Sequence, residues 1–292
     1  MRKCVVPAAG LGMRFWPATM ALPKEMLPLV DRPVIEYGFD ELLHAGLTDV
    51  LVVTSRAKRA IEAHFATPPD VAQMAAERGV RLPSQALRLH FRRQARPRGL
   101  GHAVSLAEEH VGNEAFGVLL PDDVLVGPPC CMAEMVAVAT STGRPVLAVR
   151  RVPAALTSAY GVVAVRPGPR PGLHSVDDLV EKPAPEDAPS DLAIVGRYVL
   201  PPDIFPLLRE QPAGYGGEVQ LTDALRRLNK RVPFLAYEFP GRVFDTGSKL
   251  GFLQATIELA AEHPLLGPDV RAYLADAARR LEAEHAPPGP EA

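Results

Sequence analysis

Cysteine is scarce in this 292-residue sequence, and its three cysteines are too few and too odd in number for a disulfide framework. Cys130 and Cys131 are adjacent and poorly placed to bridge each other, while Cys4 lies in an apolar run. We therefore expect three reduced thiols, as in a cytoplasmic protein. The eight histidines and three cysteines also show no spacing that is typical of zinc ligands.

Long apolar runs and a dominant charge are missing as well. No run of about 18 apolar residues occurs, so we expect no membrane span. Basic residues precede the first apolar stretch, but Pro7 and Gly10 interrupt it too early for a signal peptide. The formal net charge is −2 and the pI is near 6.5, which argues against a general polyanion binder. A protein that is soluble and cytoplasmic is expected.

Short apolar segments alternate with helical patterns through the first half of the chain. This alternation indicates an α/β fold with right-handed crossovers and a mixed, mostly parallel central sheet flanked by helices. The ligands of such sheets gather at the carboxyl ends of the strands. The predicted strands are residues 3–8, 50–54, 87–91, 116–121 and 145–150, and the predicted helices are 34–45, 56–65, 101–110 and 131–141.

The second half has a different character, because three strand patterns follow one another with little helix between them. Residues 161–165, 175–182 and 192–200 predict an antiparallel extension of the sheet. Helical patterns return near residues 202–209, 219–229 and 248–263. We divide the chain into a domain of residues 1–263 and a C-terminal helical appendage of residues 264–292, whose last segment, "HAPPGPEA", is expected to fray.

A glycine-rich loop follows the first strand, in the segment "VVPAAGLGMRFWPATMALPKEMLPL". Its backbone N–H groups around Ala9, Gly10 and Gly12 could approach anionic oxygens. It matches neither the dinucleotide fingerprint nor the P-loop, and a bare G-x-G is equally compatible with a tight structural turn. Arg14 and Lys24 in the same loop favour a triphosphate ligand over a solvated surface loop.

Two aspartates are positioned to hold a metal ion. Asp122 follows the predicted strand 116–121, and Asp245 follows the short strand-like segment "RVF". Carboxylates at strand ends suit a hard, oxygen-loving cation beside phosphates. Each aspartate taken alone could equally be a turn or a helix cap. Asp123 is expected to point elsewhere, because neighbouring side chains of a strand alternate in direction.

A candidate base-recognition segment, "RRQARPRGLGHA", contains Gln94 and Gly99. The amide of a glutamine can pair with both a donor and an acceptor on a pyrimidine edge. Five arginines between residues 88 and 98 raise the alternative of nucleic-acid binding. Phe91 is the only aromatic residue among them and the whole chain is slightly acidic, so a solvated basic face is favoured and no nucleic-acid partner is expected.

Taken in order along residues 3 to 260, the motifs resemble the sugar-nucleotide pyrophosphorylases, and most closely the bacterial UTP–glucose-1-phosphate uridylyltransferases. The segments that carry the resemblance are "PAAGLGMRFWPATMALPKEMLPLVDRPVIEY", "GLGHAV", "LLPDD", "LVEKP", "AIVGRYVL", "GGEVQLTDAL" and "FDTGSKLGF". The resemblance implies a nucleotidyltransferase fold with a Rossmann-like core, and a Mg²⁺-dependent reaction of UTP with glucose 1-phosphate that gives UDP-glucose and pyrophosphate. Rival substrates are dTTP and galactose 1-phosphate, and a non-catalytic nucleotide-sugar-binding regulator is a second alternative.

The resemblance also implies roles for individual residues. Asp122 and Asp245 would bind Mg²⁺, Arg14 and Lys24 would hold the β- and γ-phosphates, and Gln94 and Gly99 would contact the base. Glu181 would accept hydrogen bonds from the sugar hydroxyls, Lys182 would grip the sugar phosphate, and the backbone at Gly161 and Gly196 would approach the hexose. Such enzymes often form dimers or tetramers, so a homo-oligomer is expected.

Three positions of the loop depart from the family pattern. Met13 stands where a small hydroxyl residue is usual, Trp16 replaces an aliphatic residue, and Met20 replaces a common lysine. The loss of a hydroxyl group and a cation beside the triphosphate could weaken nucleotide binding or shift specificity. A working enzyme is still expected if the main cations are in place.

Overall fold

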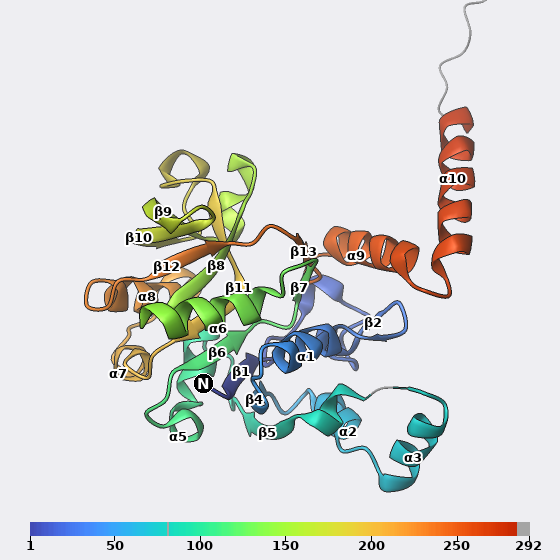
Figure 1. Cartoon of the computed structure of the whole chain (residues 1–292), viewed down its shortest axis with the longest axis horizontal. Coiled ribbons are helices and arrows are strands. Elements are labelled where there is room, and N and C mark those ends of the chain that lie inside the picture. Colours follow the sequence, from blue (N-terminus) through green and yellow to red (C-terminus); the bar gives the residue numbers. More distant parts are fainter. Residues whose placement is uncertain (81, 285–292) are drawn as a thin grey trace, which may run out of the picture.

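The computed structural model describes residues 1–80 and 82–284, and its centre is a nine-stranded mixed sheet covered by helices (Figure 1). Across the sheet the strands are β5 (Arg88–Arg93), β4 (Asp49–Thr54), β1 (Lys3–Pro7), β6 (Phe116–Leu119), β11 (Leu192–Leu200), β8 (Val146–Arg151), β12 (Leu235–Glu238), β10 (Leu173–Glu181) and β9 (Gly161–Arg170). The α/β architecture predicted from the sequence is therefore confirmed.

Parallel and antiparallel pairs divide the sheet. The strands β5, β4, β1 and β6 run parallel to one another, and β12 runs parallel to β8. Strand β11 is antiparallel to both β6 and β8, and β10 is antiparallel to β12 and β9. Only β9 and β10 form the predicted extension at the edge. Strand β11 lies in the middle instead, because all nine of its residues are buried and need cover on both faces.

Two hydrophobic layers hold the helices against the sheet. In β1, Val5 belongs to one layer while Cys4 and Val6 belong to the other, as expected from the alternation of side chains along a strand. One layer is covered by α1 (Val34–His44), α2 (Arg59–Phe65) and α6 (Cys131–Thr142), and the other by α4 (Leu100–Ser105), α5 (Glu108–Val111), α7 (Ile204–Arg209) and α8 (Leu221–Asn229).

Helix ends follow local signals where the sequence supplies them. Helix α1 ends as predicted before Gly46, whose φ of 71° is left-handed. The N–H groups of Gly46 and Leu47 donate to the carbonyl oxygens of Leu43 and Leu42 at 3.1 and 2.9 Å. The predicted helix 101–110 is wrong as a single element, since it divides into α4 and α5. Helix α3 (Pro69–Glu77), which the sequence analysis does not predict, has no buried side chain.

Smaller ribbons support the edge where β1 and β6 end. Strand β7 (Asp123–Val126) pairs antiparallel with β13 (Arg242–Asp245), which confirms the strand-like segment before Asp245. The short strands β2 (Pro28–Leu29) and β3 (Arg32–Pro33) form a hairpin before α1. The β7–β13 ribbon places the two candidate metal ligands side by side in the fold, although they are far apart in sequence.

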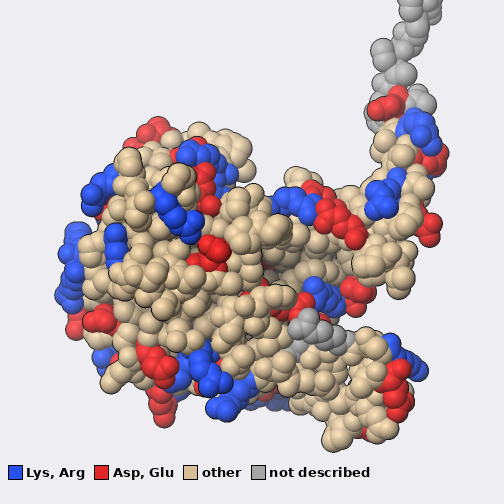
Figure 2. All heavy atoms as spheres, in the orientation of Figure 1, with Lys and Arg blue, Asp and Glu red and all other residues tan. Residues whose placement is uncertain are grey.

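Two helices complete the described chain. Helix α9 (Lys249–Glu262) follows the β13 turn, and α10 (Gly267–Glu284) contacts α9 and extends away from the body (Figures 1 and 2). The predicted frayed tail, residues 285–292, lies outside the described residues. Among the helices that the structure describes, none combines the length and apolar character needed to cross a membrane.

Candidate active site

The glycine-rich loop folds back on itself between β1 and α1. Gly12 has a left-handed φ of 65°, and its carbonyl oxygen accepts a hydrogen bond from the Thr19 hydroxyl at 2.7 Å. A Cβ atom on Gly12 would lie 3.4 Å from the Cβ of Lys24. The loop therefore returns over its own glycine, and this close approach brings Lys24 back beside the end of β1.

Lys24 forms an ion pair with Asp122. The Lys24 Nζ atom lies 2.5 Å from Asp122 Oδ2, and both residues line a cavity of about 430 Å³. Burial disfavours both charges, but their attraction outweighs it and raises the pKa of Lys24 to about 12. For Asp122 the same ammonium overcomes the opposing effect of burial and holds the carboxyl pKa below its usual value. Both groups are charged at neutral pH.

A second ion pair lies next to the first and is almost completely buried. Lys58 Nζ donates to both carboxylate oxygens of Glu25, at 2.8 and 2.6 Å, and the two residues are 4% and 1% exposed. Burial raises the pKa of Glu25 and lowers that of Lys58, in each case against the pull of the partner. Removal of either partner would leave an uncompensated buried charge. The pair fixes the helical turn that carries Lys24, and the sequence analysis missed it.

Asp122 and Asp245 face one another across a glycine. The Asp245 Oδ1 atom accepts the N–H of Gly247 at 2.9 Å. A Cβ atom on Gly247 would lie 2.9 Å from both Asp122 Oδ2 and Asp245 Oδ1. Thr246 links the two segments, since its N–H and hydroxyl donate to the Asp122 carbonyl oxygen at 2.8 and 2.7 Å. Two carboxylate oxygens that flank one small space fit the requirements of a hard divalent cation.

Asp123 points away from this space, as expected. Its Oδ2 atom accepts the N–H of Gly196 at 2.9 Å. Burial, together with repulsion from Asp122, raises the pKa of Asp123 to about 7. A Cβ atom on Gly196 would lie 2.5 Å from the Cβ of Leu120 and 2.7 Å from Asp123 Oδ2. Neighbouring protein atoms therefore leave no room for a side chain at Gly196. Gly196 is not among the residues that line the cavity.

Arg197 holds the turn between β6 and β7 in place. Its side chain is 1% exposed and pairs with Glu41 Oε2 at 2.8–2.9 Å. The remaining guanidinium N–H groups donate to the carbonyl oxygens of Leu120 and Asp123 at 2.9 and 2.8 Å, and to that of Gly196. Arg197 is therefore a positioning residue for Asp122. The signal for it was an arginine inside the otherwise apolar strand "AIVGRYVL".

The far end of the cavity contains the predicted base-recognition residues. Gln94 and Gly99 both line it, together with residues of the glycine loop, including Ala9 and Gly10. The Gln94 Nε2 atom donates to His102 Nδ1 at 2.7 Å and to the Gly99 carbonyl oxygen at 3.4 Å. With the amide N–H groups committed in this way, the Gln94 oxygen is left to accept from a ligand. The contact of Gln94 with a base stays a prediction.

Glu181, Lys182 and Gly161 meet at the end of β10. Thr222 donates to Glu181 Oε2 at 2.6 Å, and a Cβ on Gly161 would lie 3.0 Å from the Thr222 hydroxyl and 3.3 Å from the same carboxylate oxygen. Lys182 Nζ lies 3.6 Å from Glu181 Oε1 and 5.2 Å from the centre of the Tyr215 ring. The sequence analysis missed both Thr222 and Tyr215, although Thr222 lies in a motif that it quotes.

Arg14 stands apart from the other predicted residues. It lies in the short helix η1 (Met13–Phe15), is exposed, and is not among the residues lining the cavity. Phe15 anchors this helix by an edge-on contact with Phe252 of α9, at 5.7 Å between ring centres. The three departures from the family pattern, Met13, Trp16 and Met20, are 63%, 52% and 71% exposed. Met13 also lines the cavity, whereas Trp16 and Met20 are not among its lining residues.

A larger hollow of about 810 Å³ lies elsewhere, between β13 and α9. Two of its arginines are paired with carboxylates: Arg151 pairs with Glu238 at 2.9 Å, and Arg242 pairs with Glu258 at 2.7 Å. It contains neither the glycine loop nor the facing aspartates. We therefore assign the chemistry to the smaller cavity.

Comparison with known proteins agrees with the family resemblance of the sequence motifs. The nucleotidyl transferase family profile matches residues 3–262. The UTP–glucose-1-phosphate uridylyltransferase of Streptococcus pneumoniae is 46% identical, in an alignment that covers 96% of this chain and 97% of that protein.

Two solved structures also resemble the chain closely. A crystal structure of UDP-glucose pyrophosphorylase complexed with UDP-glucose superposes with a TM-score of 0.84 at 38% identity, covering 90% of this chain and all of that one. The UTP-bound enzyme of Acinetobacter baumannii gives a TM-score of 0.84 at 37% identity, covering 94% of this chain and 98% of that one.

Proposed function

The chain belongs to the nucleotidyl transferase family, and we propose that it transfers a uridylyl group from UTP to glucose 1-phosphate, releasing pyrophosphate. The observation that carries the proposal is one cavity lined by the glycine loop, the Lys24–Asp122 pair and Gln94. A nucleoside triphosphate has the matching chemistry, with anionic oxygens at one end and a base edge at the other. The relatives described above are named for this reaction.

Repulsion between the substrates is the main obstacle to this reaction. An oxygen of the sugar phosphate attacks the α-phosphorus of UTP, and two anions at about 4 Å repel each other by several kcal/mol at an effective dielectric of about 20. The nucleophile is already anionic, so no strong base is needed. Positioned cations therefore supply the catalysis. Lys24 acts at the triphosphate, and Lys182 holds the sugar phosphate.

Asp122 and Asp245 would hold a divalent cation, which we propose to be Mg²⁺. Bound there, the ion would neutralise phosphate charge and orient the α-phosphate. Lys24 currently takes an oxygen of Asp122 that such an ion would use. When the ion takes that oxygen instead, the Lys24 ammonium becomes available to a phosphate oxygen of the nucleotide. Asp123, bonded to the Gly196 N–H, stays outside this ligand set.

We propose matching roles for the residues around the rest of the nucleotide. The backbone N–H groups at Ala9, Gly10 and Gly12 point toward the triphosphate in our proposal, and the exposed Arg14 folds over the β- and γ-phosphates. The Gln94 oxygen accepts the N3–H of uracil beside Gly99.

At the sugar end, Glu181 accepts hexose hydroxyl hydrogen bonds while Thr222 fixes its second oxygen. The backbone at Gly161 approaches the sugar, whereas the N–H of Gly196 is already bonded to Asp123 and supports that residue instead. Lys182, whose ammonium lies 3.6 Å from Glu181 Oε1, then meets the sugar phosphate beside that carboxylate.

Pyrophosphate release tests this function directly. We would screen UTP, dTTP, ATP and GTP against glucose 1-phosphate and galactose 1-phosphate, with and without Mg²⁺. UTP with glucose 1-phosphate should be the preferred pair, in a Mg²⁺-dependent reaction. Preference for dTTP or for galactose 1-phosphate would reassign the substrates, and nucleotide binding without any turnover would support a non-catalytic regulator instead.

Gly247→Ala tests the cation space separately. The added methyl group would lie where the two carboxylate oxygens converge, so the apparent Mg²⁺ affinity should fall at least tenfold. The variant should still fold in the absence of UTP. The measurement is pyrophosphate release as a function of Mg²⁺ concentration. The melting temperature without Mg²⁺, compared with that of the wild type, controls for a general loss of stability.

We also propose that the enzyme is a cytoplasmic homo-oligomer. Three free cysteines and phosphorylated substrates suit the cytoplasm. Exposed apolar side chains on α9, on α10 and in the turn between them, such as Leu250, Tyr273 and Leu265, support association with a second copy. The division into residues 1–263 and a C-terminal appendage agrees with a family match that ends at residue 262.

A further inference from the structure

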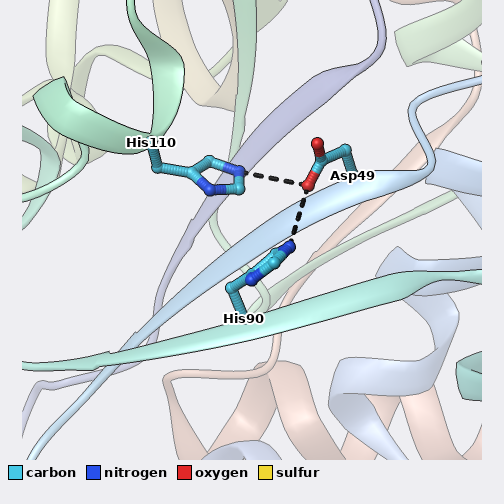
Figure 3. Close-up of side chains that lie close together, drawn as sticks. All are labelled: Asp49, His90 and His110. Atoms are coloured by element: carbon cyan, nitrogen blue, oxygen red, sulfur yellow. Dashed lines mark ion pairs between the residues drawn. The ribbon is translucent and has the colours of Figure 1, made fainter.

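Two histidines and an aspartate meet far from the catalytic edge of the sheet (Figure 3). Asp49 is the first residue of β4, His90 lies within β5, and His110 lies in α5. All three point to the face of the sheet that α5 covers. Because β4 ends at Thr54, on the catalytic side, Asp49 lies roughly 17 Å from that edge.

The spacing of the three side chains matches a metal site. His90 Nε2 and His110 Nε2 lie 3.2 and 3.3 Å from the same oxygen, Asp49 Oδ1. In a tetrahedral zinc site, with bonds of about 2.0–2.2 Å, neighbouring ligand atoms are about 3.3 Å apart. All three candidate ligand atoms lie within 4.8 Å of one another, so one ion could contact each of them.

Hydrogen bonds do not satisfy all the buried polar atoms of these three side chains. Asp49 Oδ1 and His110 Nε2 are both shielded from solvent, and neither atom makes a hydrogen bond of acceptable geometry. Burial, opposed by Asp49, lowers the pKa of the His110 imidazole, which favours the neutral form that binds metals. Unsatisfied buried polar atoms are costly, and a bound cation would satisfy both at once.

Two of the neighbouring positive charges, on Lys3 and Arg92, are engaged with other partners. Lys3 Nζ pairs with Glu114 at 2.9 Å and donates to the Val111 carbonyl oxygen at 3.0 Å. Arg92 pairs with Glu109 at 3.1 Å. With both imidazoles in the neutral form that binds metals, the two histidines and the carboxylate would together carry a net charge of −1, which attracts a divalent cation.

We propose that Asp49, His90 and His110 form a binding site for a divalent transition-metal ion, with Zn²⁺ as the best match, distinct from the Mg²⁺ site proposed for catalysis. Two nitrogens and one oxygen suit zinc, and three protein ligands leave one position for water. The site joins β4, the edge strand β5 and the short helix α5. Its role is to clip the edge of the sheet to the helix above it.

Metal titration of the full-length, tag-free, chelator-treated protein tests the proposal. Saturating Mg²⁺ is kept present so that the catalytic carboxylates are occupied. We expect calorimetry to show one equivalent of Zn²⁺ bound, Co²⁺ to give the visible absorption of a four-coordinate ion, and Zn²⁺ to raise the melting temperature by several degrees. Absence of saturable binding at one equivalent would overturn the proposal.

Matched variants locate the site. His90→Gln and His110→Gln should each weaken Zn²⁺ binding at least tenfold and abolish the thermal shift, while the melting temperature without zinc stays that of the wild type. His174→Gln is the control, because His174 pairs with Glu238 alone, at 2.9 Å, and should bind Zn²⁺ normally.

Two outcomes of the variant series would contradict the assignment: wild-type zinc affinity in both cluster variants, or an equal loss in the control. If His110→Gln does not fold, His90→Gln still decides, because the His90 side chain is 45% exposed and contributes little to packing. The test does not depend on the reaction proposed above, since every readout is metal binding or thermal stability.

Discussion

At the scale of single residues, the backbone conformation of Lys182 sets the position of its ammonium group. Its φ of 46° lies in the left-handed region, which is uncommon for a residue with a side chain. The Lys182 N–H donates to the Tyr160 carbonyl oxygen at 3.0 Å and keeps the chain in that conformation. The ammonium is 3.6 Å from Glu181, a loose contact that leaves it available to a phosphate.

Lys182→Ala should abolish turnover while largely sparing UTP binding. The loss of one positioned charge at the nucleophile should lower kcat by roughly 10²–10³-fold. Pyrophosphate release and calorimetric UTP titration measure the two effects. The control is Lys230→Ala, on the exposed end of α8. A parallel loss of UTP affinity and turnover would contradict the assigned role.

His102 gives the site a dependence on pH. Burial and then the nearby Arg98 lower the pKa of the imidazole below its ordinary value of 6.5, so the neutral ring accepts from Gln94 at pH 7. A depressed histidine pKa favours the neutral folded form, and this stabilisation is lost as pH falls through the folded-state pKa. Protonation would place a donor against the Gln94 amide N–H and turn the amide away.

The KM for UTP should therefore rise several-fold as the pH is lowered below about 6.5. His102→Gln, which has no titrating ring, should remove that part of the pH profile. Steady-state kinetics from about pH 5 to about pH 8 check this. An unchanged KM in the wild type across the range would show that His102 does not govern the orientation of Gln94.

At the scale of elements, short turns decide where the acidic residues stand. The turn after β13 is closed by Ser248, whose hydroxyl caps α9 by accepting the Gly251 N–H at 3.1 Å and donates to the Asp245 carbonyl oxygen at 3.1 Å. A Cβ atom on Gly251 would lie 2.2 Å from that carbonyl oxygen, so this glycine is required by packing. The residues of the motif "TGSKLG" thus fix the position of Asp245.

Ser248→Ala should lower the free energy of unfolding by about 1 kcal/mol through loss of the helix cap. Activity should fall further than stability, because the same hydroxyl orients Asp245. Urea unfolding and Mg²⁺-dependent pyrophosphate release measure the two effects. Ser248→Thr retains the hydroxyl and should restore both, and failure of that rescue would argue against the cap.

The elements that sequence patterns missed have physical reasons for being missed. Helix α3 buries no side chain and therefore leaves no apolar periodicity to detect. Residues 101–110 carry one continuous helical pattern, yet the chain turns at Ala107 between α4 and α5. A periodic pattern shows that a face is buried, but it does not show that the helix is unbroken.

At the scale of the whole molecule, the described part of the C-terminal arm exposes apolar side chains to solvent. Figure 2 shows α10 extending from the body with tan side chains between its charged ones. Leu265 and Tyr273 are 83% and 65% exposed. Burial of these side chains against a second copy would recover hydrophobic free energy that the single chain does not gain.

The double variant Leu265→Glu with Tyr273→Glu should therefore reduce the molecular mass in solution to that of a monomer. Size-exclusion chromatography with light scattering measures it. Val71→Glu, on the exposed helix α3, adds the same charge elsewhere and should leave the assembly intact. A wild-type protein that is already monomeric would contradict the proposed homo-oligomer.

The sequence alone determined the fold class, because apolar runs of strand length alternate with helical periodicity and dictate a covered α/β sheet. It also predicted the candidate site, because the glycines, Arg14, Lys24, Asp122, Gln94, Lys182 and Asp245 lie in motifs whose order matches one family. These are local or ordered features of the chain.

Only the tertiary structure decided which of those residues meet. The Lys24–Asp122 pair spans 98 positions, the buried Arg197 bonds to carbonyl oxygens more than 70 positions away, and β11 is placed between β6 and β8. The candidate zinc ligands Asp49, His90 and His110 likewise come from three separate elements. Spacing along the chain cannot reveal such contacts, because strand order, and not sequence distance, sets which side chains become neighbours.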